Sequence, residues 1–530
     1  MPDAAASHFD RALAALLARG PGRMVPDLDR ITDLAGLLGD PQSAYPSVHV
    51  TGTNGKGSVV RMVGALCSAA GLSAGTYTSP HLQSVRERLS VAGRPISASR
   101  FAEVYDDIAA LAQLVDDESV RRDGDTADLV TFFELLTAMA YWWFADLPVD
   151  VGVFEVGMGG RWDATNLVRG DVAVVNEIDV DHSELGATPV EVAGEKVGII
   201  KPGGRVVTAG QRPDVLRVIE DAATAVGATV WRFGDHLDVA DRRVAVGGQL
   251  IALRVGERVV DDILLPMFGA HQARNAALAL GAFAALTGVA FDAMEDDVVR
   301  HGLGAVTVPG RLEIVRREPT VVLDGAHNPH GARAAAAALE ESFGFRELVL
   351  VIGCLDDKDI GGILAELRDV ASHVIVTRAP GPRGAAVERM HEAALATWQG
   401  TGRVVEVADD VATALELAES VAGDGDGILV AGSLLTVGAA RDVYLPTSEI
   451  DDTFGDDDAV VREPGDDPPE ATDADDGIDA EGTEADHMRE DDLDEATVDE
   501  LAELLRDEEA FRVALDDLFD AEDDDPSSDS

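Results

Sequence analysis

The chain has 530 residues and is 46% hydrophobic, so it is long enough to bury more than one core, and two or three domains are expected. Its formal net charge of −56 excludes nucleic acids and anionic membrane surfaces as partners, because both bind basic patches. With two cysteines and no apolar stretch long enough to span a bilayer, the sequence predicts a cytoplasmic protein that binds small molecules.

The first informative element is a glycine-rich loop between a predicted strand at 48–50 and a predicted helix at 59–70. Residues 52–58 read Gly-Thr-Asn-Gly-Lys-Gly-Ser. Backbone N–H groups of such a loop point at an anion, Lys56 can reach a terminal phosphate, and the Ser58 hydroxyl can bind Mg²⁺. The pattern therefore predicts a nucleoside triphosphate with Mg²⁺, bound by Thr53, Asn54, Gly55, Lys56, Gly57 and Ser58.

The loop differs from the ordinary P-loop pattern G-x-x-x-x-G-K-[ST]. Val50 stands where the first glycine belongs, and Gly57 separates Lys56 from Ser58. We therefore do not expect an ordinary kinase or GTPase.

Apolar runs alternate with helical segments along the whole body of the chain. Predicted strands of the first part lie at 151–156, 172–175 and 205–209, and those of the second part at 321–323, 348–352, 374–377, 404–407 and 428–431. This alternation predicts parallel sheets covered by helices. We expect an α/β fold with a P-loop ATPase domain at 1–302 and a smaller Rossmann-like α/β domain at 303–446.

Candidate metal-binding groups follow two of the predicted strands. Glu155 ends one strand before a glycine loop, and His182 follows the next strand. Ligands of α/β proteins bind at such strand ends, so Glu155 is expected to bind Mg²⁺ together with Ser58. A histidine after an acidic run is, taken alone, more often a surface or cap residue.

Several motifs together resemble the Mur ligase superfamily, in the variant of the folylpolyglutamate and dihydrofolate synthases. They are the loop at 52–58, the string Glu-Val-Gly-x-Gly-Gly-Arg-x-Asp-Ala-Thr-Asn at 155–166, Asp-His at 181–182, and Glu-Lys-Val-Gly-Ile-Ile-Lys-Pro-Gly at 195–203. The resemblance implies that His182 binds a second Mg²⁺ and that Lys196 is carbamylated. A buried Lys–Glu pair is the alternative for Lys196. Asp179 and Val197 depart from the family, which usually has glycine and alanine there.

Further matches lie at 271–276, 309–313 and 324–329. By resemblance, Asn275 contacts the adenine, Arg311 the phosphates, and Asp324 with His327 the ribose and phosphate region. In the second part, 356–359 and 432–434 match the family, whereas 382–384 and 435–436, near the expected amino-acid pocket, depart from it.

The segments 78–82, 85–88 and 131–134 resemble the family's pterin-binding and loop segments. The expected folate-binding residues are Ser79, Pro80, His81, Arg86, Phe133 and Asp163. The aromatic pair Phe132 and Phe133 beside Glu134 suits a flat pterin, because rings stack and a carboxylate accepts from the N–H groups of the heterocycle. Both rings could equally be helix core.

The resemblance implies an amide ligase. ATP would phosphorylate a carboxylate of dihydropteroate or a folate, and the amine of L-glutamate would attack the acyl phosphate, with Lys56, Lys196, His182 and Arg311 as catalytic residues. We expect a monomer. The alternatives are another Mur-type amino-acid ligase and a nucleotide-binding scaffold without turnover.

Charge is concentrated at the end of the chain. Residues 451–530 hold 35 acidic and 4 basic residues, and the tail at 447–530 is expected to be disordered, with amphipathic helices near 492–520. The chain has four lysines, Lys56, Lys196, Lys201 and Lys358. An acidic, lysine-poor composition suggests a cytoplasm with molar salt, where self-repulsion is screened. An ordinary acidic protein is the alternative.

Overall fold

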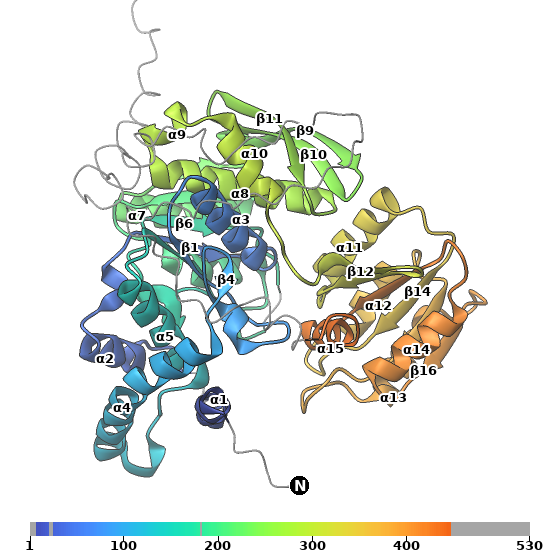
Figure 1. The fold of residues 1–530 in the computed structure, drawn as a ribbon, viewed down its shortest axis with the longest axis horizontal. Coiled ribbons are helices and arrows are strands. Elements are labelled where there is room, and N and C mark those ends of the chain that lie inside the picture. The colour runs from blue at the N-terminus through green and yellow to red at the C-terminus, as the bar shows by residue number, and fades with distance from the viewer. Residues whose placement is uncertain (1–6, 21–24, 181–182, 447–530) are drawn as a thin grey trace, which may run out of the picture.

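A computed structural model describes residues 7–20, 25–180 and 183–446, so the acidic tail and His182 lie outside the described residues. Within them the chain forms two α/β units, each with its own sheet (Figure 1). The predicted α/β fold with two such units is confirmed.

The first unit is built on an eight-stranded sheet with the strand order β4-β3-β2-β5-β1-β6-β7-β8. Strands β2, β5, β1, β6, β7 and β8 run parallel, and β3 and β4 add an antiparallel edge. The strands are β1 Ser47–Thr51, β2 Ala74–Tyr77, β3 Leu89–Val91, β4 Arg94–Pro95, β5 Val151–Glu155, β6 Val172–Val175, β7 Arg205–Thr208 and β8 Thr229–Arg232.

Helices cover both faces of this sheet. They are α1 His8–Ala18, α2 Asp29–Leu37, α3 Lys56–Ala69, α4 Ala98–Asp123, α5 Phe132–Asp146, α6 Pro189–Lys196, α7 Pro213–Val226, α8 Ala270–Thr287, α9 Val289–Ala293 and α10 Asp296–Gly304. One face packs against α3 and α8. The other face of the sheet forms an aromatic core with α4 and α5 and a smaller core with α6 and α7. Because both faces are buried, the central strands are rich in apolar residues, which made them recognisable in the sequence.

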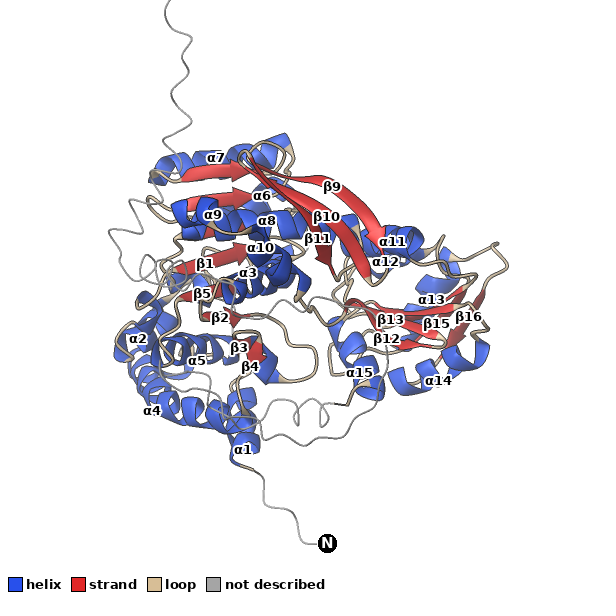
Figure 2. Ribbon diagram, turned by 45° about the horizontal axis from the view of Figure 1, so that its top comes forward, coloured by secondary structure: helices blue, strands red, loops and turns tan. Residues whose placement is uncertain are grey.

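A three-stranded antiparallel sheet, which the sequence reading did not predict, lies against α8 with the order β11-β10-β9 (Figure 2). Its strands are β9 Leu237–Ala245, β10 Gly248–Val255 and β11 Arg258–Leu265. β10 alternates buried and half-buried residues, the pattern of a sheet with one covered face. This sheet extends the core of the first unit beyond its βα units.

The second unit has a six-stranded sheet with the order β12-β13-β17-β14-β15-β16. The strands are β12 Arg311–Arg317, β13 Thr320–Asp324, β14 Leu348–Ile352, β15 His373–Val376, β16 Val404–Val407 and β17 Gly427–Ala431; the helices are α11 Pro329–Ser342, α12 Ile360–Leu367, α13 Val387–Thr397, α14 Val411–Val421 and α15 Leu434–Tyr444. Only β12 is antiparallel to its neighbour. α11, α12 and α13 pack on one face, and α14 and α15 on the other.

Among the described residues, none of the helices combines the length and the apolar character that crossing a bilayer demands.

Candidate active site

The glycine-rich loop joins the end of β1 to the start of α3, at the carboxyl edge of the first sheet. Gly52 and Gly55 have φ angles of +143° and +80°. A Cβ atom on Gly52 would lie 2.7 Å from Cβ of Asn176, and one on Gly55 would lie 2.6 Å from its Nδ2. Both positions therefore require glycine, and the backbone N–H groups at the start of α3 face the space above the loop.

Ser58 and Glu155 form the polar floor beside this loop. The Ser58 hydroxyl is buried and has no hydrogen-bond partner among the described residues. Glu155 accepts a hydrogen bond from the Ser79 N–H (3.0 Å), and a Cβ on Gly57 would lie 3.1 Å from its Oε2. Burial raises the pKa of Glu155, which the nearby Lys56 ammonium partly offsets.

An orphaned hydroxyl beside a buried carboxylate fits Mg²⁺, which prefers a few hard oxygen ligands and completes its shell with water and phosphate. Within residues 7–20, 25–180 and 183–446, no three His, Cys, Asp or Glu side chains gather as a metal site of their own. The predicted ligand His182 lies outside the described residues.

Two adjoining cavities open above the loop, between the two units. The first, the phosphate cavity, has a volume of about 160 Å³ and is lined by Lys56, Glu155 and His327 among others. The second, the nucleoside cavity, has a volume of about 380 Å³ and is lined by Asn275 and Asp324 among others. Asn54, Gly55, Ser58 and Arg311 line both. Together they provide room for an elongated anionic ligand in the size range of small-molecule pockets.

Lys56 and Lys196 approach the same backbone oxygen from different helices. The Gly52 carbonyl accepts from Nζ of Lys56 at 3.1 Å and from Nζ of Lys196 at 2.8 Å. Lys196 is buried at the end of α6. Two ammonium groups sharing one acceptor create a locally positive site within an acidic protein, which favours a bound anion.

Asn275 and Asp324 are both held rigidly where they line the nucleoside cavity. Oδ1 of Asn275 accepts from Nδ2 of Asn176 (2.9 Å), and its own Nδ2 donates to Oε1 of Gln272 (3.0 Å). The Asp324 carboxylate accepts from the N–H groups of Leu312 (3.0 Å) and Ala326 (2.9 Å). Burial raises the pKa of Asp324, and Arg311 opposes that shift.

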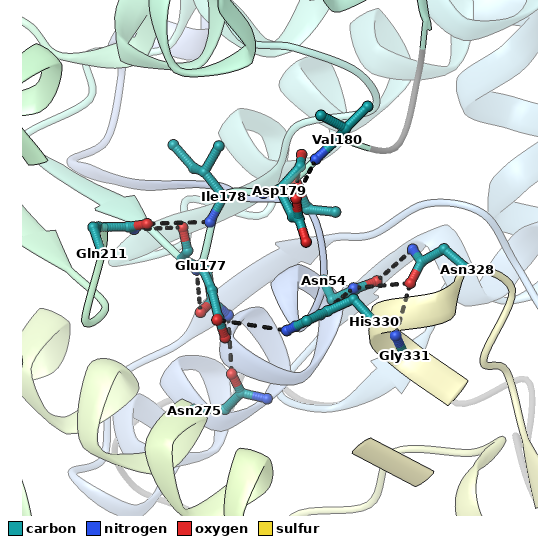
Figure 3. A network of polar contacts seen from close by, with 12 residues as sticks. Asn54, Glu177, Ile178, Asp179, Val180, Gln211, Asn275, Asn328, His330 and Gly331 are labelled. Carbon is teal, nitrogen blue, oxygen red and sulfur yellow. Dashed lines mark hydrogen bonds and ion pairs between the residues drawn. The ribbon is translucent and has the colours of Figure 1, made fainter. Parts of the chain in front are cut away.

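A polar network connects the two units beside the nucleoside cavity (Figure 3). The amides of Asn54 and Asn328 exchange two hydrogen bonds, of 3.2 and 3.1 Å. His330 lies with Nδ1 2.9 Å from Nδ2 of Asn54 and with Nε2 3.5 Å from Glu177. The interaction with Glu177 raises the pKa of His330 and lowers that of Glu177. The loop of the first unit therefore contacts the start of α11 in the second.

Sequence reasoning did not assign roles to Glu177 and His330. Only their positions in the sequence could have identified them. Glu177 follows the end of β6, and His330 lies in the first turn of α11, where polar groups of the two units meet. His327, which was predicted, lines the phosphate cavity, with Nδ1 2.8 Å from the Gly325 carbonyl.

Of the predicted folate residues, Ser79 and Pro80 line the phosphate cavity, whereas His81, Arg86, Phe133 and Asp163 are not among its lining residues. His81 accepts from Nε of Arg88 (2.9 Å), and burial together with Arg88 lowers its pKa to about 4, so the ring is neutral. Arg86 donates to the Ile96 carbonyl, and its guanidinium lies 5.9 Å from the centre of the Phe9 ring, within the helical layer.

The aromatic pair and its acid are engaged within the protein. Phe132 and Phe133 begin α5 and pack partly buried against the aromatic core of the first unit, which is the helix-core alternative. Glu134 accepts from Nε of Arg30 (3.1 Å) and from the Thr131 N–H (2.8 Å). The Glu134 carboxylate thus holds α2 against the start of α5, and it is not free to accept hydrogen bonds from a pterin.

Asp163 shapes the glycine loop that follows β5. Its carboxylate accepts from the N–H groups of Met158 (2.9 Å) and Thr165 (3.0 Å). Phe133 lies against this loop, since a Cβ on Gly157 would be 2.6 Å from its ring. Phe133 and Asp163 therefore both border Gly157, which lines the phosphate cavity.

The two motifs matched in the second unit begin helices. Asp359 accepts from the Gly362 N–H at the start of α12 (2.9 Å), and Ser433 accepts from the Leu435 N–H at the start of α15 (3.1 Å). Nζ of Lys358 lies 3.5 Å from Asp357. Leu434 lines the phosphate cavity, so the start of α15 borders the site.

Comparison with known proteins agrees with this geometry. Residues 310–434 match the family model described as the Mur ligase glutamate ligase domain. The chain is 45% identical over 444 residues to the dihydrofolate synthase/folylpolyglutamate synthase of Mycobacterium tuberculosis, covering 80% of this chain and 91% of the relative.

Solved structures show the same fold. A structure of the Mycobacterium tuberculosis folylpolyglutamate synthase complexed with ADP superposes with a TM-score of 0.78 at 43% identity, covering 83% of this chain and 98% of that one. A folylpolyglutamate synthase complexed with AMPPCP and folate superposes with a TM-score of 0.71 at 30% identity, covering 82% and 99%. The chain belongs to the dihydrofolate synthase/folylpolyglutamate synthase family, and its fold is that of a Mur ligase.

Proposed function

We propose that this protein is an ATP-dependent amide ligase that adds L-glutamate to dihydropteroate, to reduced folates or to both. The observation that carries the proposal is the pair of adjoining cavities between the two units, with the glycine loop and Arg311 lining both and Lys56 and Glu155 lining the phosphate cavity. In this assignment residues 1–302 bind ATP and the folate substrate, and residues 303–446 complete the ligase site.

The first step transfers the γ-phosphoryl group of ATP to a carboxylate oxygen of the acceptor, which gives an acyl phosphate and ADP. The amine of L-glutamate then attacks the acyl carbon, the amide bond forms, and inorganic phosphate and a proton leave. No protein nucleophile is needed. The acyl phosphate is open to hydrolysis, so a site enclosed between two units protects it from water.

The residues supply positioning and charge. Lys56 and the N–H groups of the loop hold the terminal phosphates, and Arg311, which lines both cavities, faces the transferring group. Ser58, Glu155 and His182 would hold Mg²⁺, which, when bound, neutralises charge on the phosphoryl oxygens. Asn275 and Asp324 bind the nucleoside.

Carbamylation of Lys196 is part of the proposal. Addition of CO₂ to the neutral amine forms an N–C bond and, on loss of a proton, an anionic oxygen group. The support is that Lys56 and Lys196 share the Gly52 carbonyl, since converting one of these cations to an anion removes their repulsion. ¹³C-labelled bicarbonate should give a carbamate signal that is absent in Lys196→Arg; a signal that persists in that variant contradicts the assignment.

We further propose that the protein is a monomer that works in a cytoplasm of molar salt, which its net charge of −56 and its four lysines support.

The deciding experiment measures ADP release in high KCl with Mg²⁺, ATP and L-glutamate, with dihydropteroate or tetrahydrofolate as acceptor. Turnover with both identifies a bifunctional synthase, and turnover with one identifies a monofunctional enzyme. Absence of acceptor-dependent turnover with either would overturn the proposed function.

A further inference from the structure

Arg61 is the one described residue that lines both the phosphate cavity and a third cavity of about 340 Å³. It lies on α3, three residues after Ser58 and four after Gly57. Residues three and four apart share a face of a helix, so Arg61 continues the face that Gly57 and Ser58 present beside Glu155. Its side chain therefore stands where the two cavities meet.

The third cavity, which we call the side cavity, lies between α3, the β2–β3 pair and α10, and α3 contacts both β2 and α10. Ser68, Thr76, Ser90 and His301 contribute polar side chains to its walls. Its volume falls in the range of ligand pockets, which begins at about 300 Å³. The side cavity is thus large enough for part of a substrate, with Arg61 at its inner end.

Arg61 is half-buried and forms no hydrogen bond or ion pair within the part of the chain that the structure describes. Burial lowers the pKa of its guanidinium, whereas the charges of Glu87 and Glu155 favour the protonated form. Glu87 is committed elsewhere, because it accepts from the N–H groups of Leu82, Gln83 and Ser84. A guanidinium has five N–H donors, and those of Arg61 are available to a ligand in the two cavities that it lines.

The neighbouring cations have other tasks. Lys56 and Arg311 stand at the phosphate positions of the loop and the nucleoside cavity. The reaction also consumes two molecules that carry carboxylates, the acceptor and L-glutamate. A guanidinium matches a carboxylate through two parallel hydrogen bonds, whereas phosphate can equally be held by lysine and loop N–H groups.

We propose that Arg61 binds a substrate carboxylate and that the side cavity receives part of the same molecule. This inference rests on the ligase function proposed above. The carboxylate belongs either to the pteroyl acceptor or to L-glutamate, and separate kinetic measurements distinguish the two sources.

The test compares Arg61→Gln, Arg61→Lys and a control, Arg19→Gln, in the full chain at high KCl. Arg19 is similarly shielded but pairs with Asp116 and lines none of the three cavities. KM is measured separately for ATP, the pteroyl acceptor and L-glutamate. Loss of a charge-assisted pair should raise one carboxylate substrate's KM about 10- to 100-fold in Arg61→Gln. KM for ATP should stay within about twofold of the wild-type value. Arg61→Lys should recover part of the lost substrate affinity, because lysine keeps the positive charge but cannot form two parallel hydrogen bonds as a guanidinium does.

Each outcome decides the inference. A raised KM for the acceptor alone assigns the acceptor carboxylate, and a raised KM for L-glutamate alone assigns the amino acid. A raised KM for ATP alone, or equal effects in Arg61→Gln and Arg19→Gln, overturns the inference. If Arg61→Gln does not fold, Arg61→Lys is measured instead, and three unchanged KM values in that variant also overturn the inference. Failure of the wild-type protein to turn over any pteroyl acceptor would instead refute the proposed function.

Discussion

At Ser58, the hydroxyl group that would bind Mg²⁺ lowers the stability of the unliganded protein. Its buried hydroxyl has no partner among the described residues, so it costs desolvation in the unliganded protein and is available to a ligand. In Ser58→Ala the apo protein should therefore melt no lower than wild type. The Mg²⁺ concentration for half-maximal activity should rise by about tenfold or more.

Ser119→Ala is the matched control for this prediction. The Ser119 hydroxyl donates to the Asp128 carbonyl (2.9 Å), so this variant should lose stability and keep its Mg²⁺ requirement. An unchanged Mg²⁺ dependence in Ser58→Ala would remove Ser58 from the metal site.

His330 gives the contact between the two units a pH dependence. Interaction with Glu177 raises the pKa of His330 above its ordinary 6.5, so this stabilisation is full below 6.5 and is lost as pH rises through the raised value. The same interaction lowers the pKa of Glu177. The stabilisation linked to Glu177 is therefore full above its ordinary pKa of 4.5 and is lost as pH falls through the lowered pKa. Both contributions are complete between about 4.5 and 6.5.

We therefore expect the difference in melting temperature between wild type and His330→Gln to be largest near pH 5.5 and to vanish near pH 9. The pair is partly exposed, so the effect should be small, about 1 kcal/mol or less. A difference that grows with rising pH would contradict the ion pair.

At the scale of elements, the loop before α3 is fastened to the segment that follows β6. The Thr53 hydroxyl donates to the Asp179 carbonyl (2.7 Å) and accepts from the Asp179 N–H (2.9 Å), and the Thr53 N–H donates to the Glu177 carbonyl (2.9 Å). Asp179, where the family usually has glycine, is thus held through its backbone. The side chain at 179 is not part of this contact.

Thr53→Val removes both hydroxyl bonds while keeping the shape of the side chain. It should destabilise the protein by about 1–3 kcal/mol and raise KM for ATP, because two backbone groups lose a partner and the loop loosens. Thr287→Val is the control, since the Thr287 hydroxyl bonds only within α8, to Phe283. Equal KM values in the two variants would show that the fastening does not matter for nucleotide binding.

At the scale of the whole molecule, net charge opposes function in dilute buffer. ATP, folates and L-glutamate are all anions, and the chain carries −56. The Debye length falls from about 10 Å at 0.1 M salt to about 3 Å at 1 M, so salt screens distant repulsion more than contacts within the cavities. We expect KM for ATP to fall and the melting temperature to rise as KCl increases towards molar values.

This prediction is checked by ATP kinetics and thermal melts over a KCl series, with NaCl of equal ionic strength as a control for screening. A KM for ATP that rises steadily with salt would contradict the screening argument, and a flat melting temperature would contradict adaptation to salt.

The sequence by itself determined the α/β fold, the family and the glycine loop. Parallel strands buried on both faces leave continuous apolar runs, and a phosphate-binding loop is contiguous in the chain, so both are readable without coordinates. Continuous motifs also pointed to Asn275, Arg311 and Asp324, which the structure places around one pair of cavities.

Tertiary structure alone decided what each side chain is free to do. Glu134, a plausible pterin acceptor in sequence, is used by Arg30, and Arg86 turns into the helical layer, because their partners lie in segments distant along the chain. The contact of His330 with Glu177 and the place of Arg61 between two cavities arise in the same way. Local patterns encode strands, helices and loops, but which polar groups meet depends on packing between elements that the sequence separates by scores of residues.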